Sequence, residues 1–203
     1  MKRFLIFSLF LFLAFCVNAQ TFSPGNSWDD WDDEESVPHY TIDDYAVNNK
    51  GDQLIHLSLE GFGGLSPRNL RYGAGFSLGY NVFQSAGFSF GATFDPHYAK
   101  TRGSNVFYFV PVMAKGTFYM TVGRFEIPIS ISAGAAMQSY LSQFYFGPSI
   151  KPEIGVYYRQ SADWSVGLTL GATVLPQIYF GNSAKSSMVG STVNAGLSVR
   201  YHF

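Results

Sequence analysis

The stretch VNAGLSVRYHF, residues 193–203, alternates between apolar residues and small or polar ones along its whole length. The apolar set is Val193, Ala195, Leu197, Val199, Tyr201 and Phe203. Successive side chains of a β-strand point to opposite faces of its sheet, so this rhythm predicts a strand with one apolar and one polar face. The class of fold depends on what each face meets.

The first twenty residues have the layout of a secretory signal peptide. Two basic residues precede an apolar run over residues 4–17, and small Ala19 before Gln20 marks the expected cleavage site. The run is shorter than the roughly 20 residues that a membrane-spanning helix needs. Lipidation of Cys16 is an alternative, but a bulky phenylalanine precedes it where lipoprotein signals have a small residue. We therefore expect an exported mature chain without cysteine or disulfides.

The composition of the chain indicates that the exported protein lies in a membrane. Charged residues make up 13% of the chain and aromatic residues 18%, whereas charged residues account for about 25% of a typical soluble domain. After the signal, no apolar run is long enough for a membrane helix. A closed β-barrel is the other structure that satisfies every backbone group in lipid.

Charge divides the mature chain in two. Residues 20–50 contain eight acidic residues and one basic residue, whereas residues 51–203 contain six acidic and ten basic residues. The acidic stretch lacks apolar periodicity and the D-x-D-x-D-G spacing of a calcium loop. We predict three segments: a signal peptide over 1–19, a mostly disordered periplasmic tail over 20–50, and a barrel over 51–203.

Eight stretches of the third segment fit β-strands: 53–62, 70–82, 87–98, 106–121, 125–137, 150–159, 164–174 and 188–203. In the fourth, Phe107 and Phe109 break the alternation. Short turns follow every second strand and longer links follow the others, which is typical of outer-membrane barrels. We therefore predict an all-β fold, an eight-stranded antiparallel up-and-down transmembrane barrel, with both barrel termini on the periplasmic, short-turn side.

The alternation also fits a soluble calycin-type barrel with its apolar face inside. Three features favour an apolar exterior. The polar face is rich in glycine, serine and threonine, its charges are of both signs and can pair in a lumen, and aromatic residues of the apolar face gather at the turn ends. These aromatic residues are Tyr80, Phe88, Phe118, Phe125, Tyr158, Trp164, Tyr201 and Phe203.

Residues 51–203 resemble the small eight-stranded outer-membrane barrels of the OmpX, OmpW and OmpA transmembrane-domain type. The likeness is one of architecture, and its most specific part is the last strand. In that group, a final phenylalanine with apolar residues at alternate positions before it is read by the barrel-assembly machinery. The resemblance implies this role for Leu197, Val199, Tyr201 and Phe203, a location in the outer membrane of a two-membrane bacterium, and outer-membrane lipid as a partner.

The predicted function is a structural or surface-interaction role, with a lumen plugged by paired charges. The expected network comprises Glu60, Arg71, Lys115, Glu126, Lys151, Glu153, Arg159 and Arg200. The aromatic link over residues 138–147 could bind an extracellular ligand or simply extend two strands.

Two other functions remain open. The first is a narrow channel for small solutes of the OmpW type. The second is a lipid A-modifying barrel enzyme, for which Asp95 and His97 share the polar face without an identifiable nucleophile. We expect no enzyme activity, no cofactor, no metal site and no nucleic-acid partner.

Overall fold

The computed structural model describes residues 48–66, 70–101, 106–140, 143–177 and 188–203. The predicted signal peptide with its Ala19–Gln20 cleavage site, and the acidic tail up to residue 47, lie outside these ranges. Within the described ranges, no helix is long and apolar enough to cross a membrane.

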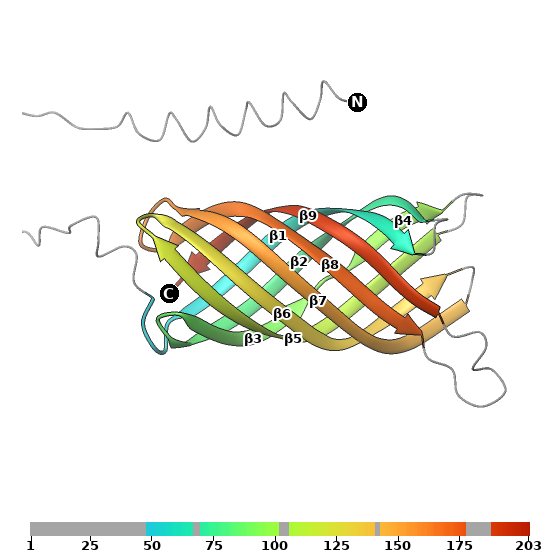
Figure 1. The fold of residues 1–203 in the computed structure, drawn as a ribbon, viewed down its shortest axis with the longest axis horizontal. Coiled ribbons are helices and arrows are strands. Elements are labelled where there is room, and N and C mark those ends of the chain that lie inside the picture. Colours follow the sequence, from blue (N-terminus) through green and yellow to red (C-terminus); the bar gives the residue numbers. More distant parts are fainter. Residues whose placement is uncertain (1–47, 67–69, 102–105, 141–142, 178–187) are drawn as a thin grey trace, which may run out of the picture. The chain divides into compact units, whose positions relative to one another are not determined.

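The described chain folds into a closed ring of antiparallel strands (Figure 1). The strands are β1 (Gln53–Ser66), β2 (Leu70–Ser85), β3 (Phe88–Phe94), β4 (His97–Thr101), β5 (Val106–Val122), β6 (Phe125–Tyr140), β7 (Gln143–Arg159), β8 (Trp164–Gln177) and β9 (Met188–His202). Strands that follow one another in the sequence pair with each other, except β3 and β4, and β1 also pairs with β9, which closes the ring. Strands β3 and β4 share one place between β2 and β5. The predicted eight-stranded up-and-down barrel is therefore confirmed.

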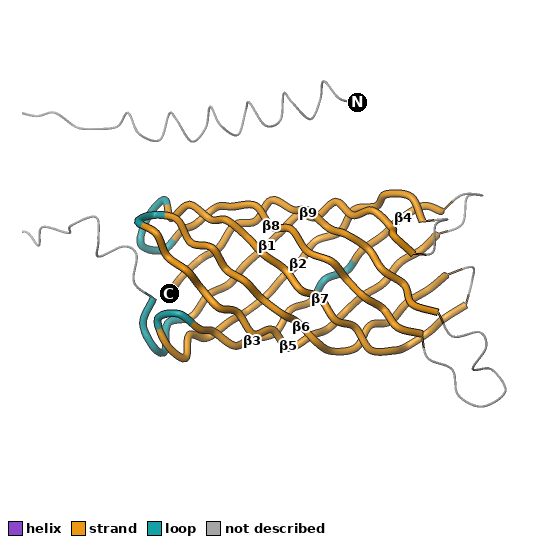
Figure 2. Tube along the Cα trace, viewed as in Figure 1, coloured by secondary structure: helices purple, strands orange, loops and turns teal. Residues whose placement is uncertain are grey.

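The third predicted strand is interrupted at Asp95–Pro96, which Figure 2 shows as a short loop-coloured break in the wall. Proline has no N–H and cannot donate to the ladder. The wall stays bonded across the break, because the Asp95 N–H donates to the Pro111 carbonyl and the Phe76 N–H donates to the Pro96 carbonyl, both at 3.1 Å. The single strand predicted over 87–98 is thus two strands with one interruption.

Tight turns after β2, β5 and β7 gather at one end of the barrel, which we call the turn end (Figure 2). The strand ends that the other connections join lie at the opposite end, which we call the loop end. The stretch predicted as a long aromatic link, residues 138–147, is mostly strand. It forms the end of β6 and the start of β7, with only residues 141–142 between them outside the description. Strand extension, and not a long loop, accounts for its aromatic residues.

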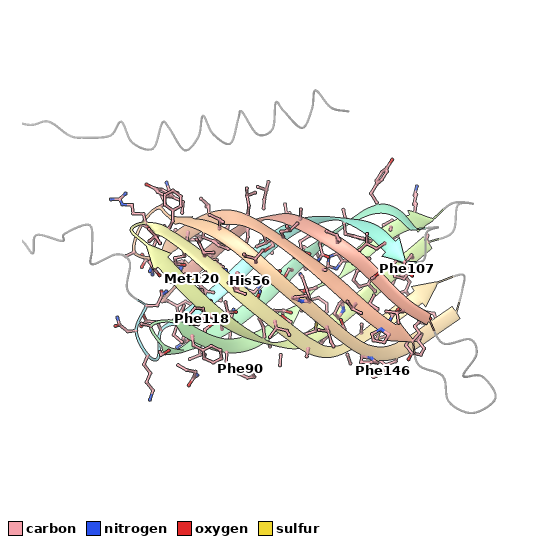
Figure 3. All side chains as sticks on the ribbon, in the orientation of Figure 1. His56, Phe90, Phe107, Phe118, Met120 and Phe146 are labelled. Atoms are coloured by element: carbon pink, nitrogen blue, oxygen red, sulfur yellow. The ribbon has the colours of Figure 1, made fainter. Side chains whose placement is uncertain are left out.

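The two faces of the wall have opposite chemistry. On β9, Arg200 is 4% exposed while its neighbours Val199 and Tyr201 are 41% and 38% exposed. In Figure 3, Phe90 lies outside the wall and His56 inside it. A polar interior with an apolar exterior is the reverse of a soluble barrel and suits a wall bathed in lipid.

Aromatic rings mark both borders of the apolar band. At the turn end, ring centroids lie 5.4 Å apart in the pair Phe125–Tyr158 and 4.9 Å apart in the pair Trp164–Tyr201. Towards the loop end of β7, Phe146 is 70% exposed. The span from Tyr158 to Phe146 is about 30 Å for a rise of about 3.3 Å per residue and a tilt of about 40°. That span matches the hydrocarbon core of a bilayer.

Candidate functional site

One buried lysine holds three carboxylates in the middle of the lumen. The Lys151 Nζ atom of β7 lies 2.8 Å from Glu60 Oε1, 3.0 Å from Asp95 Oδ2 and 3.3 Å from Glu153 Oε2. Glu60 comes from β1 and Asp95 from the break between β3 and β4, so the contacts cross the barrel. An ammonium has three protons to donate, and here each of the three carboxylates is within reach of it.

Further donors surround these carboxylates. Lys115 Nζ donates to Glu153 Oε1 at 2.7 Å. Glu60 Oε2 accepts from His97 Nε2 at 3.0 Å and from Asn194 Nδ2 at 2.9 Å, and Ser77 Oγ donates to Asp95 Oδ1 at 2.6 Å. Buried charges are retained when they are paired and hydrogen-bonded, as these are. We call Glu60, Asp95, Lys115, Lys151 and Glu153 the central network.

His97 joins the central network to an apolar layer. Its Nδ1 lies 2.7 Å from the Asp95 carbonyl oxygen, and its Nε2 faces the Glu60 carboxylate. Both partners are acceptors, so both ring nitrogens must carry protons for both bonds to form. The His97 ring stacks on Phe109 with centroids 4.7 Å apart and planes 4° apart. This geometry fixes the histidine between charge on one side and an aromatic ring on the other.

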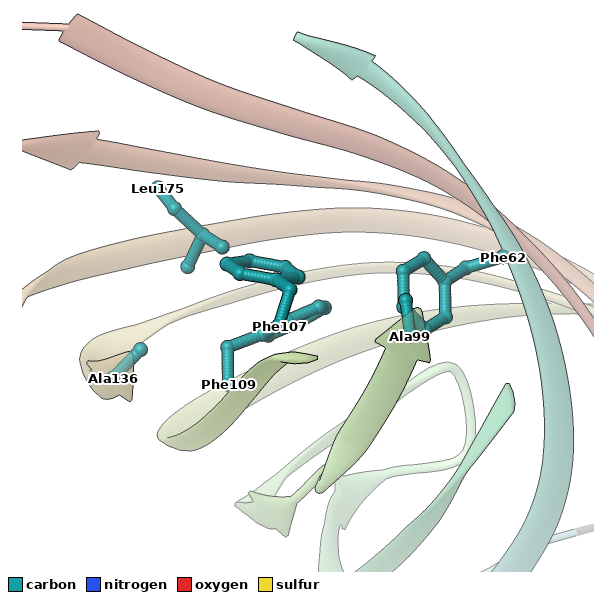
Figure 4. Packing of buried hydrophobic residues seen from close by; sticks show 6 residues of the cluster. All are labelled: Phe62, Ala99, Phe107, Phe109, Ala136 and Leu175. Atoms are coloured by element: carbon teal, nitrogen blue, oxygen red, sulfur yellow. The ribbon is translucent and has the colours of Figure 1, made fainter. Parts of the chain in front are cut away.

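The apolar layer fills the loop-end part of the lumen (Figure 4). Its buried residues are Phe62, Ala99, Phe107, Phe109, Ala136 and Leu175. Phe62 meets Phe109 edge-on at 5.5 Å, and Phe107 lies 5.3 Å from Phe109. The two phenylalanines that break the alternation in the sequence therefore point inwards, into the lumen. Sequence reasoning missed this layer because it assigned apolar residues to the lipid face.

A second charged group, the turn-side cluster, lies nearer the turn end. Arg159 Nη1 is 3.2 Å from Glu126 Oε1, and Arg200 Nη1 is 3.6 Å from Glu126 Oε2. The Arg200 guanidinium lies 3.3 Å above the centroid of the Tyr157 ring and 5.7 Å from that of Tyr119. Cation–π contact supplies electrostatic stabilisation that the single carboxylate does not.

Large rings use the space that inward glycines leave. His56 of β1 is paired with Gly79 of β2. A Cβ atom at Gly79 would collide with the His56 imidazole ring. Glycine at this position lets a ring from the adjacent strand cross the lumen, so glycine-rich strands do not leave an open bore here.

The predicted site residues fall into these two groups. Lys115, Lys151, Glu153 and Glu60 lie in the central network, and Glu126, Arg159 and Arg200 form the turn-side cluster; the Arg71 side chain lies outside the described part of the structure. Sequence reasoning left Asp95, His97 and Asn194 out of the network, although it placed all three on the polar face. It also left out Asn48, which precedes the first predicted strand and bonds to Arg159 and Glu126. The four residues of the predicted assembly signal, Leu197, Val199, Tyr201 and Phe203, lie on the exterior and are 38–52% exposed.

The lumen also brings a serine close to an acid and a histidine. Ser77 Oγ lies 2.6 Å from Asp95 Oδ1 and 3.4 Å from His56 Nε2. Its hydroxyl donates to the carboxylate and not to the histidine, and all three side chains are buried. A serine nucleophile is activated by a base that accepts its proton, and this geometry differs from that arrangement. No cluster of potential metal ligands occurs among the residues that the structure describes.

Comparisons with known proteins agree with this architecture. A protein-family model matches residues 32–201, and the chain belongs to that family. One relative, an uncharacterised protein of Treponema pallidum, is 38% identical over 132 residues, which is 64% of this chain and 59% of the relative. A second protein of the same organism is 24% identical over 62% of this chain and 48% of its own length. The chain thus spans about half to three fifths of these relatives.

Two solved structures share the fold. The outer membrane protein OprG of Pseudomonas aeruginosa has a TM-score of 0.55 at 10% identity, covering 78% of this chain and 98% of OprG. Neisserial surface protein A has a TM-score of 0.57 at 11% identity, covering 75% of this chain and 99% of that protein. The fold is that of the small outer-membrane β-barrels.

Proposed function

We propose that this small outer-membrane β-barrel protein is closed along its axis and acts through its loop end, as a non-enzymatic surface-interaction protein. The observation that carries the proposal is the central network, in which Lys151 of β7 joins Glu60 of β1 and Asp95 of the β3–β4 break across the lumen. An eight-stranded barrel has an interior only just wide enough for side chains to fill. From the turn end to the loop end, the turn-side cluster, the central network and the apolar layer occupy this interior.

The sequence of the segments that join the strands at the loop end supports a choice of partner chemistry. The connections there, with the strand residues beside them, contain five basic residues and no acidic one: Arg68, Arg71, Lys100, Arg102 and Lys185. The acidic residues of segment 51–203 are in the lumen or near the turn end. A surface of a single sign attracts polyanions and steers their association. We propose a phosphorylated or sulfated polysaccharide as the partner.

Binding to dextran sulfate tests the partner chemistry. A loop-end variant, Arg68→Gln with Lys100→Gln, should bind immobilised dextran sulfate more weakly and with a flatter salt dependence than the parent. A turn-end variant, Lys50→Gln with Arg124→Gln, removes the same charge from the other end and should bind like the parent. Equal loss in both variants would show net charge, and not the loop end, to be responsible.

Planar-bilayer recordings test the closed axis. The refolded parent should give no steady conductance steps, because the buried ion pairs leave no continuous aqueous path. Well-defined steps in the parent would replace the closed barrel with the narrow-channel alternative.

One observation favours a second function, the passage of small apolar solutes through the wall. Among the described residues, β7 and β8 pair from Arg159–Ser165 only as far as Ile150–Val174, although β7 continues to Gln143 and β8 to Gln177. The register places Pro148 opposite Pro176, where neither residue has an N–H to donate. We call this unpaired stretch, from Pro148 on β7 and Pro176 on β8, the seam. Leu175, a member of the apolar layer, lies beside it.

Restoring donors to the seam tests this second function. Pro148→Val with Pro176→Val should allow β7 and β8 to pair further and should slow the uptake of a small aromatic hydrocarbon by expressing cells. Pro128→Val, in β6 towards the turn end, serves as the control and should leave uptake unchanged. Equal uptake by the parent, the double variant and Pro128→Val would show that solutes do not pass through the seam.

Biogenesis supplies two further proposed partners, outer-membrane lipid and the barrel-assembly machinery. The exposed, alternating side chains of Leu197, Val199, Tyr201 and Phe203 support the β9 strand as the segment that this machinery reads. Replacing Phe203 with serine should lower the yield of heat-modifiable barrel in the membrane, and an unchanged yield would argue against this role.

A further inference from the structure

The turn-end mouth of the barrel meets a residue that precedes the first strand. Asn48 is 1% exposed. Its Oδ1 accepts from Arg159 Nη1 at 3.2 Å, and its Nδ2 donates to Glu126 Oε1 at 3.4 Å. Since Arg159 and Glu126 also bond to one another at 3.2 Å, the three side chains form a closed ring of hydrogen bonds. Asn48 therefore fills part of the lumen, although it does not belong to a strand.

A tight turn places Asn48 there. The Asp52 N–H donates to the Asn49 carbonyl at 3.2 Å, and Gly51, between them, has a φ of 99°. A positive φ at the third residue of a four-residue turn is typical of type II, where glycine is preferred. The Asn49 N–H donates to Asp52 Oδ2 at 2.7 Å and fixes the turn further. The chain therefore reverses before β1, so that Asn48 does not continue the line of the strand.

The attachment of this segment is slight in comparison with that of a strand. Within the described part of the chain, one backbone pair joins it to the barrel, with Gly51 N–H donating to the Phe83 carbonyl and Phe83 N–H donating to the Asp52 carbonyl, both at 2.9 Å. β1 itself is bonded along its length on both sides. Segments held by few bonds open at a lower free energy than strands in continuous ladders.

We infer that residues 48–52 form a releasable strap that seals the turn-end mouth of the lumen. Asn48 is its contact with the interior, through the Arg159 and Glu126 side chains. Release leaves the strand ladders intact and exposes Glu126 and Arg159 to water from the turn end. The inference goes beyond the proposed surface role, because it concerns access to the opposite end of the barrel.

Thiol labelling tests the strap directly. The sequence has a single cysteine, Cys16, within the predicted signal peptide, so Ser165→Cys provides the only thiol in a refolded chain that begins at Gln20. Ser165 is fully buried and is paired with Arg159 across β7 and β8. Added Asn48→Ala should speed its reaction with a small charged thiosulfonate about tenfold or more, since hydrogen bonds to charged groups stabilise by at least such a factor.

Two further variants make the test decisive. Asn49→Ala removes the neighbouring side chain, which is exposed, and should leave the labelling rate unchanged. Gly51→Ala adds a Cβ with no atom within 4 Å, so it penalises only the positive φ and should speed labelling as Asn48→Ala does. If Asn48→Ala does not yield heat-modifiable barrel, Gly51→Ala decides. Labelling no faster than in the parent, or equally fast in Asn49→Ala, overturns the strap.

Discussion

The loss of Lys151 would leave a buried carboxylate in the lumen without a cation. Lys151 contacts Glu60, Asp95 and Glu153, and of these Glu153 also has Lys115 while Glu60 has His97. Among the residues that the structure describes, Asp95 would keep the Ser77 hydroxyl as its side-chain donor, and no cation. A buried carboxylate without a cation is far more costly than a well-paired one.

We therefore predict that Lys151→Met destabilises the barrel by about 3–5 kcal/mol, as breaking buried ion pairs does. Lys100→Met, at an exposed position near the loop end, is the matched control and should change stability by less than about 1 kcal/mol. Urea unfolding of the refolded proteins in lipid measures both. Similar midpoints for the two variants would contradict the structural importance of the network.

Individual residues also show where sequence reasoning succeeds and where it fails. Alternation placed Lys151, Glu60 and Arg200 on the polar face, because that assignment needs only the two-residue period of a strand. It did not identify which charges meet, because partners across a lumen depend on the tilt and stagger of all the strands. Phe107 and Phe109 looked like faults in the pattern, since nothing in a strand's own period distinguishes an inward apolar residue from an outward one.

At the scale of elements, the strands are longer than the bilayer requires. β5 and β7 have 17 residues each, whereas about 9–11 residues cross a membrane as a tilted strand. The sequence predicted where most strands lie, but it ended β6 and began β7 too far from their shared hairpin. The polar and aromatic residues of 138–147 resemble a loop in composition, and cross-strand pairing overrides that composition.

The depth of a residue on its strand should decide the cost of a charge on the exterior. Leu170, in the middle of β8, is 53% exposed, and Phe144, near the loop end of β7, is 72% exposed. Leu170→Arg should cost about 2–4 kcal/mol and Phe144→Arg about 0–1 kcal/mol, because the penalty is greatest at the bilayer midplane. Urea unfolding in vesicles compares them. A larger cost at Phe144 would shift the membrane band towards the loop end.

At the scale of the whole molecule, the two ends differ in construction and charge. The turn end has tight turns, the strap and the C-terminal strand end, where the Gln53 N–H donates to the Phe203 carbonyl at 2.8 Å. The apolar layer lies towards the loop end, and the sequence segments that join the strands there contain basic residues and no acidic one. Closure between β1 and β9 fixes this division, because an even number of strands brings the first and last strand ends to the same side.

We predict that the loop end faces outwards and the turn end faces the periplasm, as in barrels with short turns on the periplasmic side. An epitope inserted within residues 178–187 should bind antibody on intact cells. The same epitope between Gly123 and Arg124, in a turn where Gly123 has a φ of 58° and open space around it, should bind only after the outer membrane is permeabilised. Heat-modifiable migration confirms that both insertions fold. Labelling of the Gly123 insertion on intact cells would show that the barrel has the opposite orientation. The basic segments would then face periplasmic partners and not external polyanions.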